Sequence, residues 1–324
     1  MLWSIDHPAW SPISAVSANP NDLSRSHTPL TRLFFGLGAE GVAEKYTLSE
    51  QQIAFFNENG YLADYRLIFH AQVDALRAQL GGLIEPTPEI NRVLHTFNDA
   101  PPADSGKTLF HASGAWRVKQ GFHDLLWAGS LLTPAIQLLG GNVRLWQDQV
   151  FVKAPQTGAA IGWHQEAAYW SNISPIQHLI CWIALDNMTE ANGCLRVVPG
   201  SHKWGLVPGQ PAAPGQDLGA IQSLLTPEQK AEFRDVPLPM KKGWCVFMSP
   251  YLLHASGENT TEDVRRALSV TLMKSGVKTE TSDPVLPGVP AIKKGKKLDG
   301  PCFPVLYKAP KEEAVGAGTE GGEG

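Results

Sequence analysis

The period of the hydrophobic pattern changes near residue 142, and this change constrains the fold more than any other feature of the sequence. Before it, apolar residues recur mainly at helical spacing, whereas after it short strand-like runs extend to Lys274. Glycine (31 residues) and proline (25 residues) are both abundant, which favours many turns between short strands. A helical half followed by many short strands predicts a mainly β fold, a jelly-roll-like barrel with flanking α-helices.

The first predicted strand, residues 142–153, has one polar face. Alternation places Gln147 and Gln149 on that face and Trp146 and Asp148 on the other. A polar face on an interior strand predicts a wet cavity rather than a dry core. Further strands are predicted at residues 163–170, 178–186, 194–198, 236–240, 243–248, 251–254 and 265–274. The Asn192-Gly193 turn predicts that the second and third of these runs pair as a hairpin.

Helix ends are predicted from capping signals. Thr47 and Thr226 each have a Glu or Gln three residues later, the pattern of a capping box, so each is expected to start a helix. Another helix is expected to start at Thr133-Pro134, because proline favours the first helical position. Glycine favours helix ends, so Asn59-Gly60 and Gly81-Gly82 are expected to end two helices.

The length of 324 residues allows one large domain or two small ones, and we expect one domain with two irregular ends. Residues 1–45 read as an irregular N-terminal extension, and residues 46–310 as a single domain with a β-core at about 142–275 and an insertion at 203–233. Residues 311–324 are rich in Glu, Gly and Ala and are expected to be disordered.

Charge and cysteine usage exclude several classes of protein. A net charge of -4 argues against nucleic acid or an anionic membrane as the main partner. No apolar run reaches the roughly 18 residues that a membrane span needs, and the N-terminus has no signal-peptide pattern. The four cysteines form no C-x-x-C pair and favour a reduced, cytoplasmic compartment. A small-molecule partner is therefore expected.

His164 and Glu166 are the residues that point most directly to chemistry. In a strand at 163–170 they would face the same way, because side chains alternate. An imidazole and a carboxylate are two thirds of the 2-His-1-carboxylate triad that holds non-haem Fe(II), and His254 offers the third ligand. In a chain with ten histidines an H-x-[DE] triplet also arises by chance. The other histidines are expected to be surface or core residues: His7, His27, His70, His95, His111, His123, His178 and His202.

The predicted strand at 265–274 supports a cavity. Arg265 and Ser269 fall on a face of small and polar residues, whereas Arg266 and Leu268 fall on an apolar face. A guanidinium in a cavity is suited to binding a carboxylate through two hydrogen bonds. The alternative, a surface arginine in a salt bridge, fits Arg266 about as well, so the pattern of the two faces only favours Arg265 as the cavity residue.

Several motifs in order resemble the phytanoyl-CoA dioxygenase family of Fe(II)/2-oxoglutarate oxygenases. The resemblance runs from about Leu48 to Lys274, most of the chain. It is carried by Leu48–Tyr61, Trp163-His164-Gln165, Trp182–Asp186, Asn192-Gly193-Cys194, Val198–His202, His254–Asn259 and Arg265–Ser269.

The resemblance implies a double-stranded β-helix, the jelly roll of cupin-like proteins, with a defined ligand set. Iron would be bound by His164, Glu166 and His254, and the distal carboxylate of 2-oxoglutarate by Arg265. Ser256 and Trp182 match positions that line the cosubstrate pocket, and Gln147 and Lys153 match positions that face cosubstrate or substrate. The expected reaction is oxidation, foremost hydroxylation, of a small organic substrate by O2 with release of succinate and CO2.

One residue departs from the family pattern, because Glu166 stands where the family usually has Asp. A halogenase is disfavoured, since that chemistry needs the carboxylate position vacated. Gln149, Tyr169 and Trp170 are candidates to shape the substrate pocket, with plain barrel packing as the alternative. Two other functions stay open: a catalytically silent binding protein of this family, and a cupin-type metal isomerase or hydrolase, which would not need Arg265.

Overall fold

The computed structural model describes residues 22–94, 96–98, 108–209 and 218–310. The predicted disordered tail, residues 311–324, and residues 1–21 of the predicted extension therefore lie outside the described residues. In the rest of that extension, Leu23–Arg25 form a short 3-10 helix (η1) and Val42–Tyr46 a short α-helix (α1).

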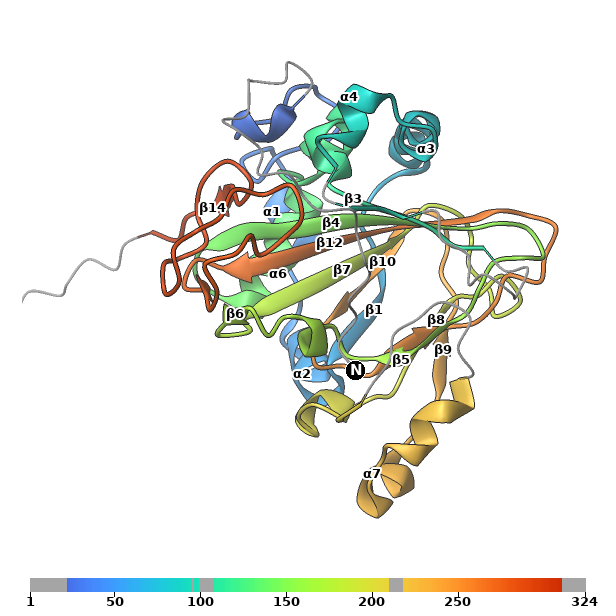
Figure 1. Ribbon diagram of the computed structural model, residues 1–324. Coiled ribbons are helices and arrows are strands. Elements are labelled where there is room, and N and C mark those ends of the chain that lie inside the picture. The colour runs from blue at the N-terminus through green and yellow to red at the C-terminus, as the bar shows by residue number, and fades with distance from the viewer. Residues whose placement is uncertain (1–21, 95, 99–107, 210–217, 311–324) are drawn as a thin grey trace, which may run out of the picture.

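A large antiparallel sheet forms the centre of the fold (Figure 1). Its strands follow the order β1-β10-β7-β12-β4-β3-β2, and β14 also pairs with β4. The strands are β1 (Tyr61–Arg66), β2 (Thr96–Asn98), β3 (Phe110–Ser113), β4 (Val143–Lys153), β7 (His178–Ala184), β10 (Trp244–Met248), β12 (Arg265–Lys274) and β14 (Val305–Tyr307).

A smaller sheet has the order β5-β11-β8-β9. Its strands are β5 (Ile161–His164), β8 (Leu195–Val197), β9 (Val236–Leu238) and β11 (His254–Ser256), and β6 (Ile173–Ser174) pairs separately with β13 (Lys278–Thr279). Trp182 and Val246 of the large sheet pack with Leu195 of the small sheet in one buried cluster. The predicted jelly-roll architecture, mainly β and flanked by helices, is confirmed.

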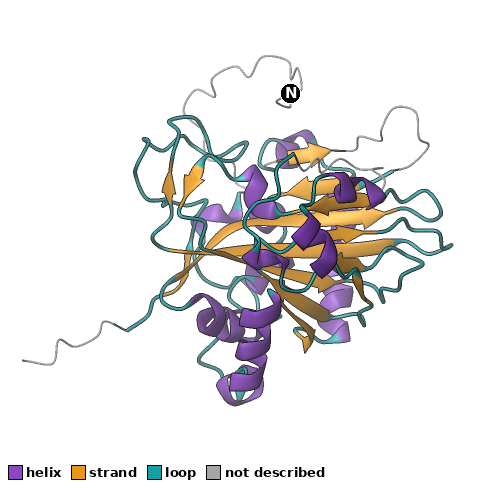
Figure 2. Cartoon of the chain, turned by 90° about the horizontal axis from the view of Figure 1, so that it is seen from below, coloured by secondary structure: helices purple, strands orange, loops and turns teal. Residues whose placement is uncertain are grey.

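Helices surround the strands (Figure 2). They are α2 (Glu50–Asn59), α3 (His70–Ile84), α4 (Pro88–Asn91), α5 (Gln120–Leu125), α6 (Gly129–Leu139) and α7 (Pro227–Glu232), with 3-10 helices η2 (Ala115–Arg117), η3 (Glu166–Tyr169), η4 (Ser201–Lys203) and η5 (Leu218–Ser223). Leu76 of α3 and Leu132 of α6 pack with Val150 and Leu268 of the large sheet. Each fully buried leucine stabilises the fold by about 1.5–3 kcal/mol. None of the helices in the described part of the chain is long and apolar enough to cross a membrane.

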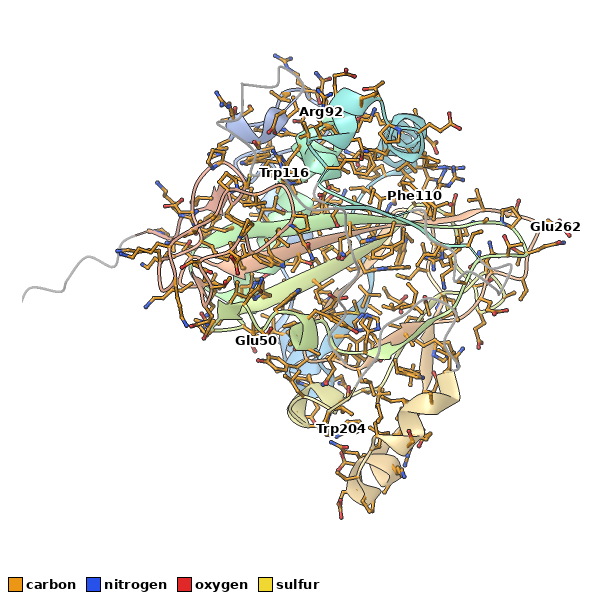
Figure 3. The ribbon with its side chains drawn as sticks, viewed as in Figure 1. Glu50, Arg92, Phe110, Trp116, Trp204 and Glu262 are labelled. Carbon is orange, nitrogen blue, oxygen red and sulfur yellow. The ribbon has the colours of Figure 1, made fainter. Side chains whose placement is uncertain are left out.

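The described residues of the predicted insertion, 203–209 and 218–233, cover the outer face of the small sheet. Ile221 and Leu225 pack with Trp163 of β5. Its helix α7 begins as predicted, because the Thr226 hydroxyl accepts from Gln229 N and the Gln229 side chain accepts from Thr226 N. Trp204 lies beside this helix, where its Nε1 donates to the carboxylate of Glu232 at 2.7 Å (Figure 3).

The predicted start of α2 at Thr47 was wrong, because a second capping signal two residues later is the one that the helix uses. Ser49, not Thr47, is the N-cap, because Ser49 and Gln52 form the reciprocal pair of hydrogen bonds. The Thr47 hydroxyl instead donates to Ala43 O and ends α1. The predicted end at Gly60 was correct.

Two further helix ends were also predicted wrongly. Helix α3 continues through Gly81-Gly82 to Ile84, because Leu83 is fully buried in the core and holds the last turn. Helix α6 starts at Gly129 and contains Pro134. A proline leaves the carbonyl four residues earlier without its helical partner. Here that carbonyl, Ser130 O, accepts from the Tyr65 hydroxyl at 3.4 Å.

A β-bulge in β4 changes the predicted faces of that strand. Thr271 of β12 pairs with Gln147, but the next residue, Leu272, pairs with Leu145, so Trp146 is the extra residue. Trp146 therefore packs on Phe303, with ring centroids 5.7 Å apart, and was wrongly predicted to share a face with Asp148. Downstream of the bulge the alternation holds.

The predicted hairpin around Asn192-Gly193 was wrong. Strand β7 pairs with β10 and β12, whereas β8 pairs with β9 and β11, so the turn joins the two sheets. The Asn192 side chain accepts from Thr189 N and donates to Asn187 O, which closes the turn without strand pairing. A Cβ at Gly193 would lie 2.3 Å from Gly257 O, so glycine allows this turn to approach the loop after β11.

Candidate active site

A cavity of about 310 Å³ lies between the two sheets. Such a volume is at the lower end of the range of ligand pockets, roughly 300–1,000 Å³. The large sheet and the residue before β3 contribute Leu109, His111, Gln149, Phe151, Ile180, Trp182, Met248, Arg265 and Ser269. The small sheet and η3 contribute Ile161, His164, Glu166, Tyr169, Leu195, His254, Ala255 and Ser256.

His164, Glu166 and His254 converge on one wall of this cavity. The pairing of β5 with β11 sets His164 directly opposite His254, and their ring centroids are 4.2 Å apart. Glu166 Oε1 lies 3.4 Å from His164 Nε2 and 3.8 Å from His254 Nε2. One potential ligand atom from each residue lies within 4.8 Å of the others. Three distant side chains thus offer ligands to one point.

The carboxylate reaches this point from a turn and not from a strand. Strand β5 ends at His164, and Glu166 begins the 3-10 helix η3, so the predicted strand at 163–170 was wrong beyond His164. The buried Gln165 holds the turn. Its Nε2 donates to Gly205 O (2.8 Å) and Tyr251 O (2.6 Å), and its Oε1 accepts from Val207 N (2.9 Å).

Hydrogen bonds and burial prepare the three groups as metal ligands. His164 Nδ1 lies 2.8 Å from Gly162 O and His254 Nδ1 lies 2.9 Å from Leu252 O, so each Nδ1–H donates and each Nε2 keeps its lone pair. Burial, with His164 nearby, lowers the pKa of His254 to about 4. Burial alone would raise the pKa of Glu166, but its neighbours His164 and then His254 hold that pKa below its usual value. A carboxylate with two neutral imidazoles is the donor set that suits Fe(II).

Arg265 lies in the same cavity as a buried cation with unused donors. Its side chain is almost fully buried, with the residue 1% exposed, and among the described residues its Nε and Nη1 have no hydrogen-bond partner. Burial lowers the pKa of Arg265 to about 10, and the guanidinium stays charged at neutral pH. Its carbon Cζ lies 5.4 Å from the ring centre of Trp182. An unpaired buried charge is costly, so this guanidinium fits a carboxylate ligand in the cavity.

The neighbouring Arg266 is the arginine of the surface salt bridge. Its Nε and Nη2 donate to the carboxylate of Asp186 at 2.8 and 2.9 Å. The sequence left open which arginine faces the cavity. The structure shows that Arg265 lines the cavity, whereas Arg266 lies on the other face of β12 and pairs with Asp186.

The remaining predicted residues divide into those that line the cavity and those that do not. Trp182, Ser256, Gln149 and Tyr169 line it. The others lie outside its lining: Gln147, Lys153 and Trp170. Trp170 packs on His178 with ring centroids 4.6 Å apart, in the same cluster as Trp146.

Lys153 does not line the cavity but contacts Ser256, which does. Its Nζ donates to Ser256 Oγ at 2.7 Å and to Gly257 O. Burial, and then the charge of Arg265 on the paired strand, lower the pKa of Lys153 well below its ordinary value. Because the amine donates to the hydroxyl oxygen, the Ser256 hydrogen remains available to a ligand.

His111 is a polar lining residue that the sequence analysis did not assign to the site. It lies on β3, whose pairing with β4 sets His111 opposite Phe151. The signal in the sequence was the short run Phe110–Ser113, which the sequence analysis did not predict as a strand. Only the pairing of this short strand with β4 brings its histidine to the cavity.

Comparisons with known proteins identify a family that matches most of this chain. The family model described as phytanoyl-CoA dioxygenase (PhyH) matches residues 56–267, more than half of the chain. Methylphosphonate hydroxylase of Gimesia maris is 28% identical over 231 residues, which cover 69% of this chain and 80% of that protein. Peroxisomal phytanoyl-CoA dioxygenase of Homo sapiens is 26% identical over 277 residues, which cover 82% of this chain and 75% of that protein.

A solved structure shares the fold. The epimerase SnoN, crystallised with Fe3+, α-ketoglutarate and nogalamycin RO, superposes with a TM-score of 0.65 at 20% identity. The match covers 80% of this chain and 98% of SnoN. At this identity the likeness concerns the fold alone.

Proposed function

The chain belongs to the phytanoyl-CoA dioxygenase family, whose members use Fe(II), 2-oxoglutarate and O2, and from this premise we propose that it hydroxylates a small organic molecule. The balanced reaction converts substrate, 2-oxoglutarate and O2 into hydroxylated substrate, succinate and CO2. In broad class the chain is a 2-oxoglutarate-dependent oxidoreductase.

One observation carries the proposal. The His164, Glu166 and His254 cluster opens into the same cavity as the guanidinium of Arg265, whose Nε and Nη1 have no partner in the described part of the chain. A metal isomerase or hydrolase would have use for the cluster but none for a buried cation with free donors. A ligand with one end suited to a metal and a carboxylate at the other end satisfies both features.

The residues of the chain would act by binding and positioning. His164 Nε2, His254 Nε2 and a Glu166 oxygen would hold the metal, and Arg265 with the Ser256 hydroxyl would hold the distal carboxylate by charge-assisted hydrogen bonds. When bound, iron and 2-oxoglutarate supply the oxidant: one oxygen atom of O2 ends in succinate and the other in the substrate hydroxyl. Trp182 packs beside Arg265 and keeps this end of the cavity dry.

Glu166 fits this role in spite of its length. Its carboxylate starts from the η3 turn that Gln165 holds, and its oxygen already lies between the two imidazoles. The carboxylate position is filled, which continues to disfavour halogenation.

An anaerobic titration of the Fe(II) protein with 2-oxoglutarate tests the proposal. We expect a weak visible charge-transfer band, which Arg265→Ala abolishes at the same 2-oxoglutarate concentration. Arg266→Ala is the matched control, because that arginine pairs with Asp186 outside the cavity, and it should keep the band. In air the wild type should release succinate from 2-oxoglutarate. A protein that gives neither band nor succinate is not a 2-oxoglutarate oxygenase.

A further inference from the structure

The inner face of the large sheet divides the cavity into two halves. The register sets Trp182 of β7 opposite Ser269 of β12, and Ser269 opposite Gln149 of β4. Neighbouring strands lie about 4.8 Å apart, so Gln149 is roughly 10 Å from the strand of Trp182. Arg265 lies on the middle strand, β12, whereas His111 lies one strand further out, on β3. The cosubstrate half is therefore at β7 and β12, and the β4–β3 half remains for another molecule.

Two side chains form a fixed polar pair in the second half. Gln149 Nε2 lies 3.1 Å from His111 Nε2, and the imidazole stacks on Phe151 with ring centroids 4.8 Å apart. Burial lowers the pKa of His111 to about 4, although Glu166 acts in the opposite direction, so the ring is neutral. The Gln149 amide then donates to the ring nitrogen. Among the described residues no donor is bonded to Gln149 Oε1, so this oxygen is free to accept.

We propose that His111 and Gln149 are the substrate-orienting pair, and that Gln149 Oε1 accepts from an uncharged hydroxyl or carboxamide on an apolar substrate. The inference rests on the proposed function, because it assigns the half of the cavity that 2-oxoglutarate leaves free. His111 acts by holding the Gln149 amide, and Gln149 contacts the substrate.

The electrostatics of the lining favour an uncharged group. In the described part of the lining, the charged side chains are Glu166 and Arg265, which the metal and the cosubstrate would engage. A carboxylate or ammonium beside Gln149 would lose its hydration without gaining an opposite charge, at a cost of several kcal/mol. Leu109 and Phe151 supply apolar surface around the pair.

Three six-carbon probes that differ only in their head group test the inference. Hexanamide is neutral and donates, hexanoate is an anion and hexylamine is a cation at neutral pH. Each is titrated anaerobically into the Fe(II)–2-oxoglutarate complex, and its Kd is taken from the change in the visible band. We expect hexanamide to bind most tightly. Tighter binding of hexanoate or hexylamine, or binding of none of the three, overturns the inference.

Variants test whether the preference for hexanamide depends on His111 and Gln149. Gln149→Leu and His111→Phe, which keeps a ring on Phe151, should each weaken hexanamide binding by about five- to tenfold. Neither should change the intensity of the 2-oxoglutarate band. Gln149→Glu should shift the preference to hexylamine. The control His178→Phe makes the same exchange at a buried histidine outside the cavity, and should leave all three Kd values unchanged.

The two proposals fail in different ways. Absence of the band and of succinate in the wild type contradicts the proposed function itself. A normal band with unchanged probe binding in Gln149→Leu and His111→Phe leaves the function standing and overturns the pair.

Discussion

Replacing Arg265 by methionine should stabilise the protein in the absence of ligand and remove its response to 2-oxoglutarate. Two donors of the wild-type guanidinium are buried and have no partner among the residues that the structure describes, and each such donor costs about 1–3 kcal/mol. The lost contact with the Trp182 ring, about 1–2 kcal/mol, offsets part of the gain. Replacement of buried ionic groups by apolar ones stabilises other proteins by about 1–4 kcal/mol. We therefore expect a net gain of about 2 kcal/mol for Arg265→Met.

The assay is thermal or denaturant unfolding of both proteins with and without 2-oxoglutarate, in the presence of Fe(II) under anaerobic conditions. Without 2-oxoglutarate the variant should melt higher, by roughly 4 °C. At one hundred times its Kd, 2-oxoglutarate should stabilise the wild type by about 2.7 kcal/mol and leave the variant unchanged, which reverses the order of the two proteins. A variant that is less stable without ligand would refute the reasoning, because Arg265 would then have partners of its own. Equal stabilisation of both proteins by 2-oxoglutarate would refute it as well.

Three further substitutions test other parts of the structure. Gln165→Leu removes the hydrogen bonds that hold the Glu166 turn and should weaken Fe(II) binding by about 10–100-fold, measured by competition with a chelator; unchanged affinity would show that the turn holds without them. Asp148→Ala leaves the buried amide of Trp116 without its acceptor, and leaves Gly114 N only the backbone oxygen of residue 148, so it should lower the free energy of unfolding by about 2 kcal/mol, whereas a loss under 1 kcal/mol would contradict that role. His178→Phe removes two buried ring nitrogens that have no partner among the described residues and should leave stability equal or raise it by about 1 kcal/mol; a clear loss in a melting experiment would reveal a partner.

The strands that could be predicted from sequence are those with a long, regular pattern. Residues 143–153, 178–184 and 265–274 form strands close to the predicted positions, because each run pairs along most of its length within the large sheet. The bulge at Trp146 could not be predicted, since the alternation of residue types continues through it and only the pairing with β12 reveals the extra residue. The hairpin predicted at Asn192-Gly193 was wrong for a related reason, because a turn signal does not specify which strands pair.

The candidate site shows the same division between local and long-range information. Residue types suggested His164, Glu166 and His254, and the resemblance to the phytanoyl-CoA dioxygenase family added Arg265 to the set; the structure brings all four to one cavity. The turn at Glu166 depends on Gln165 bonds to residues 205, 207 and 251, which no local pattern encodes. His111 was missed because its place depends on the pairing of a four-residue strand with a distant one.

The bulge at Trp146 also bears on the fidelity with which the cavity is assembled. It fixes how β4 aligns with β12, and a shift of one residue in a sheet reverses the side of every side chain. A misaligned β4 would turn Gln149 towards the helices and bring the apolar Val150 into the cavity, while the rest of the barrel could still close. The bulge residue, which lies outside the cavity, thus disfavours misfolded molecules that are compact but lack the side chains that would hold a substrate.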